Sequence, residues 1–136
     1  MNLQEGQLLY IKIPRYYDGV KPKKKHYVLI IEVREDAVFF VNLTKIRQVE
    51  IRNLLRPEYH ELECLNPPPD QSIAKLNAVY ALPRLDGLDK FLPNKDRISK
   101  DVFDFVKHRL QTRFYNSPTV FITENDFHKS NSLTTP

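Results

Sequence analysis

Two side chains suited to phosphate chemistry stand together at the start of an apolar run. Lys25 and His26 come directly before Tyr27-Val-Leu-Ile-Ile-Glu-Val33. A lysine ammonium is a compact positive charge, and a histidine with an ordinary pKa of about 6.5 can exchange a proton at neutral pH. A strand that carries both at its entrance is a suitable place to bind a phosphate. Thr44 and Lys45, at the end of the next apolar run, are candidates for the same site.

Cations and tyrosines crowd the connection that leads to this strand. Single-stranded nucleic acids are commonly bound by aromatic rings that stack on bases, next to cations that contact the backbone. The alternative is that the tyrosines pack over the rim of the sheet and the lysines are an ordinary solvated loop. The candidate binding residues, including two cations after the next strand, are Arg15, Tyr16, Tyr17, Lys23, Lys24, Lys45 and Arg47.

The segments around these residues predict a hairpin. The run 27–33 is apolar throughout, which is typical of a strand buried on both faces. The short polar turn 34–36 separates it from a second strand over 37–43, and a loop of this length favours an antiparallel pair. Such a pair brings the start of one strand to the end of the other. Lys25, His26, Thr44 and Lys45 are therefore expected at one end of the sheet.

The rest of the chain predicts more strands and one clear helix. Ser99 is a good N-cap, and an apolar stripe follows it with helical spacing, so we expect a helix over about 99–115. The polar residues 124–136 predict a flexible tail, which leaves 1–123 as one domain. We expect a mainly β, α+β fold, a small β-barrel or curled sheet with a packed helix. The further strands are expected at 7–13, 58–64, 72–82 and 119–123, with a helical turn at 88–92.

Composition limits the functional classes. The chain has 21 Lys and Arg against 17 Asp and Glu, a formal charge of +4, which is compatible with an anionic partner. Cys64 is the only cysteine, and the four histidines have no ligand spacing, so we expect no disulfide within the chain, no metal site and no cofactor. We see no signal-peptide pattern, and the longest apolar run is too short for a bilayer, so we expect a cytoplasmic protein without a membrane partner.

The order of the elements resembles the MazF/PemK family of toxin endoribonucleases. Gly6-Gln-Leu-Leu-Tyr-Ile11 resembles the family's opening strand, and Lys25-His-Tyr-Val-Leu-Ile-Ile31 stands where the family has Arg-Pro and four apolar residues. Val41-Asn-Leu-Thr44 matches the third strand, which ends on threonine in the family. Ala78 to Pro83 and Arg97 to Val102 resemble the last strand and the start of the helix. The resemblance covers roughly residues 3–114 and implies an SH3-like barrel of the MazF/PemK/CcdB type.

The same resemblance implies an activity and partners. Members of the family are toxins of type II toxin-antitoxin systems that cleave single-stranded RNA without metal, by attack of the 2′-hydroxyl on the neighbouring phosphorus. Their usual catalytic residues are the arginine before the second strand and the threonine after the third. Thr44 matches the threonine, Lys25 takes the place of the arginine, and His26 would supply proton transfer. The implied partners are single-stranded RNA, an acidic antitoxin and a second copy of the chain.

One departure from the family pattern keeps other functions open. A lysine lacks the planar fork with which arginine binds two phosphate oxygens at once. The first alternative is therefore a non-catalytic SH3-like barrel that binds single-stranded nucleic acid with a steep salt dependence. The second is a barrel that binds only protein partners.

Overall fold

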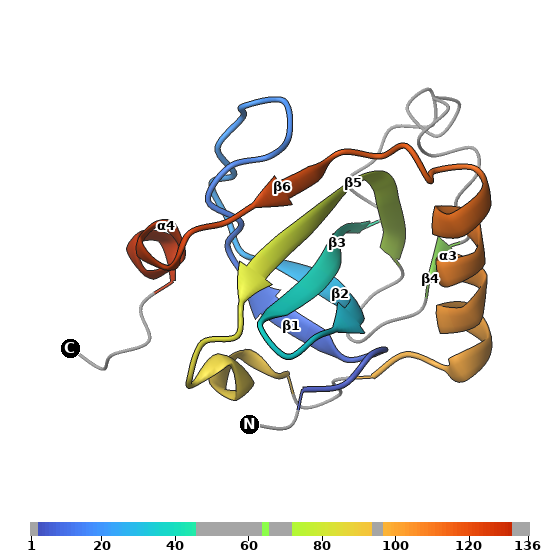
Figure 1. Cartoon of the computed structure of the whole chain (residues 1–136), viewed down its shortest axis with the longest axis horizontal. Helices are drawn as coiled ribbons and strands as arrows, with labels where there is room; N and C mark the ends of the chain where they lie inside the picture. Colours follow the sequence, from blue (N-terminus) through green and yellow to red (C-terminus); the bar gives the residue numbers. More distant parts are fainter. Residues whose placement is uncertain (1–2, 46–63, 66–71, 94–96, 132–136) are drawn as a thin grey trace.

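The sheet and its helices follow the expected order along most of the chain (Figure 1). A computed structural model of the protein describes residues 3–45, 64–65, 72–93 and 97–131. The expected strand at 58–64 lies outside these residues except for Cys64, and so does Arg47. The elements are β1 (Leu8–Ile11), β2 (His26–Val33), β3 (Ala37–Lys45), β4 (Cys64–Leu65), β5 (Ser72–Pro83), the 3₁₀ helix η2 (Leu88–Phe91), α3 (Lys100–Thr112), β6 (Thr119–Phe121) and α4 (Glu124–Ser130).

The strands form one mixed sheet of six strands, with the order β1-β2-β3-β5-β4 and β6 paired to β5. All pairs are antiparallel except β5 with β6. The predicted hairpin of β2 and β3 is confirmed. Among the described residues the ends of the path do not pair with each other, so the sheet does not close into a barrel there. The mainly β, α+β class is therefore confirmed, whereas the closed barrel is not seen.

A sharp bend in β5 lets this strand pair with three others. Phe40 of β3 pairs with Tyr80, but Asn42, two residues further, pairs with Lys75, five residues back in β5. Between these two pairs the chain advances by two residues in β3 and by five residues in β5. The extra residues of β5 interrupt the ladder and bend this strand. The part of β5 before the bend pairs with β4, and the part after it pairs with β6.

The sheet is buried on both faces, as the apolar run of β2 predicts. Val28 and Ile30 belong to one core cluster and Leu29 and Ile31 to the other, because successive side chains point to opposite faces. Helix α3 covers the second cluster with its predicted stripe, in which Val106 is buried. The first cluster contains Phe40 and Tyr80, whose rings stack 5.7 Å apart, and is closed by η2 and α4.

The start of α3 agrees with the sequence. The hydroxyl of Ser99 accepts a hydrogen bond from the backbone N–H of Val102 at 3.3 Å, which is the expected N-cap. The helix ends at Thr112, three residues earlier than predicted. No helix among the described residues is long and apolar enough to span a bilayer.

The segment after β6 differs from the flexible tail that we expected from residue 124. Thr123 caps α4 by accepting a hydrogen bond from the N–H of Asp126, and Phe127 is completely buried in the first core cluster. A single apolar residue in a polar segment gives no amphipathic pattern, so periodicity did not predict this helix. The anchoring of Phe127 in the core of the sheet supplies what the local sequence lacks.

Candidate nucleic-acid interface

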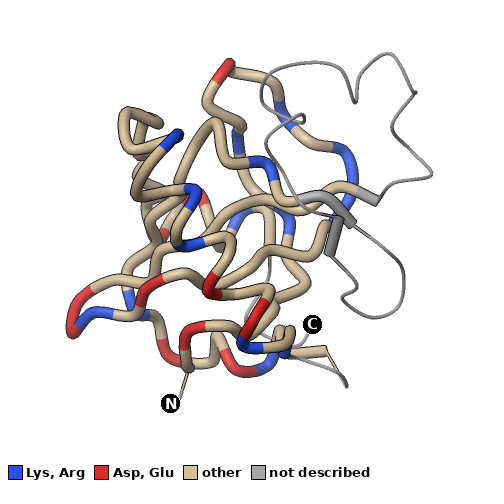
Figure 2. Tube along the Cα trace, turned by 90° about the vertical axis from the view of Figure 1, so that its right-hand side faces the viewer, with Lys and Arg blue, Asp and Glu red and all other residues tan. Residues whose placement is uncertain are grey.

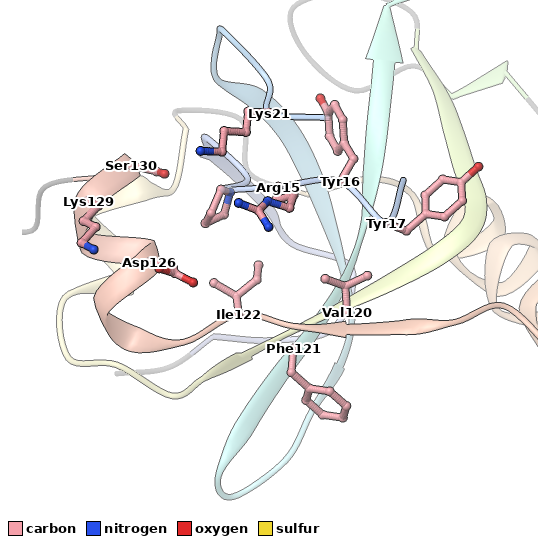
Figure 3. A pocket seen from close by; sticks show the side chains of 11 residues that line it. Arg15, Tyr16, Tyr17, Lys21, Val120, Phe121, Ile122, Asp126, Lys129 and Ser130 are labelled. Carbon is pink, nitrogen blue, oxygen red and sulfur yellow. The ribbon is translucent and has the colours of Figure 1, made fainter. Parts of the chain in front are cut away.

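A groove of about 630 Å³ lies between the loop after β1 and the segment formed by β6 and α4 (Figure 3). Val120 and Ile122 point into it from the β6 side, whereas the ring of Phe121 points away and is 77% exposed. The loop contributes the opposite wall. The lining residues are Pro14, Arg15, Tyr16, Tyr17, Lys21, Val120, Phe121, Ile122, Asp126, Lys129 and Ser130.

The wall from the loop is held by a tight turn. The N–H of Tyr16 donates to the carbonyl of Val20 at 2.8 Å, and the N–H of Gly19 donates to the carbonyl of Tyr16 at 2.9 Å. Gly19 has a φ of 88°, which favours glycine, and a carboxylate oxygen of Asp18 accepts from the N–H of Val20. The Asp-Gly turn expected from the sequence therefore forms, and it fixes where Arg15 and Lys21 leave the backbone.

The wall from α4 is attached by one buried side chain to Lys12, the residue that follows β1. Asn131, only 2% exposed, accepts a hydrogen bond from the N–H of Lys12 at 2.7 Å and donates to the carbonyl of Lys12 at 2.6 Å. Its amide thus pairs with the backbone as a neighbouring strand would. Phe127 makes an edge-to-face contact with Phe91 of η2, with the ring centroids 5.7 Å apart. Both contacts hold α4 beside the loop.

The groove is basic. Arg15, Lys21 and Lys129 line it against a single carboxylate, that of Asp126. In Figure 2 the acidic positions gather toward the end that holds the N-terminus, and the opposite end carries mainly lysine and arginine. A cleft with cations on both walls attracts anions and raises their local concentration. Val120 and Ile122 give the groove an apolar floor, which suits a ligand that also has flat, apolar groups.

The structure separates the predicted binding residues into two groups. Arg15, Tyr16 and Tyr17 lie together in the groove. Lys23 and Lys24 are exposed and are not among the residues that line it. Arg47 and the side chain of Lys45 lie outside the part of the chain that the structure describes.

The three predicted catalytic residues lie at the same end of the β2–β3 hairpin. His26 opens β2 opposite Ile11 and is half-buried, and Thr44, also half-buried, is the second-last residue of β3. Because β2 and β3 are antiparallel, the two share an end of the hairpin, as predicted. The Nζ atom of Lys25 lies 5.8 Å from the centroid of the Phe91 ring, so this exposed side chain reaches toward η2.

A polar cluster that the sequence did not predict lies behind the two tyrosines of the groove. The hydroxyl of Tyr80 accepts a hydrogen bond from the N–H of Tyr17 at 3.3 Å, and Nδ2 of Asn77 donates to the hydroxyl of Tyr17 at 3.0 Å. Burial raises the pKa of Tyr80 to about 12 and also raises the pKa of Tyr16. Both phenols are therefore neutral hydrogen-bonding groups at physiological pH.

The sequence analysis missed several residues of the groove and the cavity, because they lie in the expected tail or inside expected strands. Lys129 and Asp126 fall in the expected tail, and the only local signal for their helix is Thr123 three residues before Asp126. Lys75 is a half-buried cation in β5, and Asn42 is a buried amide in β3. A polar residue at an inward-facing strand position is unusual, and this signal could have identified Asn42.

No group of three or more potential metal-ligating side chains occurs in the described part of the chain. Comparison with known proteins adds no assignment: no family model matches this chain, and no curated protein is significantly similar to it.

Proposed function

We propose that this protein binds single-stranded RNA in the basic groove and cleaves it, as a toxin of a type II toxin-antitoxin system. The observation that supports this proposal is the composition of the groove. Arg15 and Lys21 line one wall and Lys129 lines the other, and two tyrosines lie at one end. A single strand offers both phosphates for the cations and exposed base faces for the rings. In a duplex the base faces are stacked on one another and are not exposed to the rings.

The proposed cleavage follows the family that the sequence resembles. The 2′-hydroxyl attacks the adjacent phosphorus, a 2′,3′-cyclic phosphate forms, and the 5′-oxygen leaves with a proton. In this chain His26 would take the proton of the attacking 2′-hydroxyl and return a proton to the leaving 5′-oxygen, while Thr44 and Lys25 would interact with the phosphate oxygens. The shared position of His26 and Thr44 at one end of the hairpin supports these roles.

The finer fold and the partners belong to the same proposal. The β2–β3 hairpin, the bent β5 and the later helix α3 agree with the element order of an SH3-like MazF/PemK barrel, although the described sheet is open. The antitoxin would be an acidic segment whose carboxylates compete with RNA for the groove, and the protein would act as a homodimer.

The cleavage experiment uses the purified full chain, a long single-stranded RNA and EDTA, with all new ends mapped. We expect discrete cuts that leave 5′-hydroxyl ends. His26→Ala should slow cutting by about 100-fold or more, the usual contribution of a positioned proton donor or acceptor. The control variant is Lys100→Ala, which removes an exposed positive charge from α3, away from the groove. It should cut RNA at the parent rate. Parent-like cutting by both His26→Ala and Thr44→Ala would contradict the assigned site.

A second candidate, an RNA-binding protein that does not cut, is favoured by one observation. Lys25 stands where the family has arginine, and its ammonium lies over the Phe91 ring. Intact RNA that is nevertheless bound in the same experiment would select this candidate.

The groove itself is tested by binding measurements at several salt concentrations. Arg15→Ala and Lys129→Ala should each weaken binding of a single-stranded oligonucleotide. If each cation contacts one phosphate, the slope of log affinity against log salt should fall by about 0.7. Lys100→Ala gives the same change in net charge away from the groove and should leave affinity and slope close to those of the parent. An equal effect of all three variants would indicate attraction by net charge, without a role for the groove.

A further inference from the structure

A buried amide oxygen without a partner lies next to the groove. Asn42 on β3 is 4% exposed, and its Oδ1 atom makes no hydrogen bond to any described residue. The Asn42 side chain hydrogen-bonds the hydroxyl of Tyr16, and since Oδ1 is unpaired, the amide nitrogen makes this bond. A buried acceptor left unpaired is costly, so such atoms in folded proteins usually meet water or a ligand.

A small cavity gives this oxygen room for one group. Asn42 lines a space of about 20 Å³, enough for one water-sized group. The other lining residues are Tyr16, Tyr17, Asp18, Lys75, Asn77 and Tyr80. Tyr16 and Tyr17 also line the groove, so the cavity and the groove share these two residues as a wall. Lys75 is opposite Asn42 in the ladder, and its Nζ atom lies 5.6 Å from the centroid of the Tyr16 ring.

The position of the cavity relates it to the proposed cleavage site. Asn42 and Thr44 are two residues apart on β3 and therefore point to the same face of the sheet, with backbone positions about 7 Å apart. A nucleotide whose phosphate meets Thr44 could thus place its base beside Tyr16 and Asn42.

We propose that Oδ1 of Asn42 reads the exocyclic amino group of a nucleobase, so that the protein prefers strands that contain cytosine or adenine over strands of uracil. The inference rests on the proposed binding of single-stranded RNA and names its base preference. An amino group has the size of a water molecule and donates a hydrogen bond, which is what the cavity and its acceptor require. The O4 atom of uracil would place one acceptor against another.

Two matched pairs of oligonucleotides test this preference. The labelled strands are oligo-rC and oligo-rU, which differ in the amino group or oxygen at position 4, and oligo-rA and oligo-rI, which differ in the same way at position 6. We expect the parent protein to bind the amino-bearing member of each pair about ten- to a hundredfold more tightly. Asn42→Ala should bring each ratio close to one, and Asn42→Asp, which keeps an acceptor, should retain part of it. Lys100→Ala, an exposed position on α3 outside the groove and the cavity, should leave both ratios unchanged.

Each other result is informative. Equal binding of both members by the parent protein would mean that the cavity holds water only, and it would overturn the inference without any variant. A preference that survives in folded Asn42→Ala would place the recognition elsewhere and would also overturn it. Failure to bind any of the four strands would overturn the proposed function itself, whereas equal binding overturns only the assignment of Asn42.

Discussion

Replacement of Phe127 by alanine should lower the free energy of unfolding by about 3–5 kcal/mol, the usual range for deletion of a buried phenyl ring. The ring is completely buried in the first core cluster and makes an edge-to-face contact with Phe91. It is the only buried residue within α4, so its loss should also release the helix from the groove. Urea unfolding followed by circular dichroism measures the first effect, and oligonucleotide affinity measures the second.

Phe121→Ala is the matched control for this variant. It removes the same ring a few residues away, but this ring is 77% exposed, so stability should change by no more than about 0.5 kcal/mol. Similar losses from the two variants would contradict the role given to Phe127 in anchoring α4.

Asn131→Ala should destabilise the protein by about 2–4 kcal/mol, because it leaves the N–H and the carbonyl of Lys12 without their partners. The cost arises mainly from the unsatisfied backbone groups, since the side chain itself contributes little apolar area. The midpoint and slope of urea unfolding provide the measurement. A loss below about 0.5 kcal/mol would mean that water replaces the amide without difficulty.

Asn131→Asp separates charge from hydrogen bonding at this position. A neutral carboxyl can accept from the N–H of Lys12 and donate to its carbonyl, as the amide does, whereas a carboxylate can only accept. Burial raises the pKa of such a carboxyl above its unfolded value of about 3.9. The native state then binds more protons than the unfolded state, so the variant should lose stability as the pH rises from about 4. A difference from the parent that stays constant between pH 4.5 and 7.5 would contradict this account.

The β2–β3 hairpin and α3 were predictable because their signals are local. The apolar run of β2, the short turn before β3 and the Ser99 cap each act within a few residues, and the structure contains all three features. The bend of β5 was not predictable in this way, since it depends on an unequal pairing between Phe40 and Asn42 of the neighbouring strand.

Only the wall of the groove that the loop after β1 forms was predictable from the sequence. Arg15, Tyr16 and Tyr17 stand out because cations and aromatic residues are adjacent in a loop. The opposite wall comes from a helix whose one apolar residue, Phe127, gives no periodicity, and only the tertiary contact with Phe91 shows where it belongs. The role proposed for Asn42 depends on an unpaired side-chain oxygen, which a sequence does not show, although a polar residue within an apolar strand marks the position.

The hydrogen bonds between Lys12 and Asn131 connect residues 119 positions apart. Contacts across such long loops form late in folding, because closing the loop costs chain entropy before any contact compensates for it. The β2–β3 hairpin can form from neighbouring residues, but the groove exists only after α4 has docked. A molecule that has its sheet and lacks this last contact would have the proposed catalytic residues and only half of the binding surface. Docking of α4 would therefore be the folding step that completes the groove.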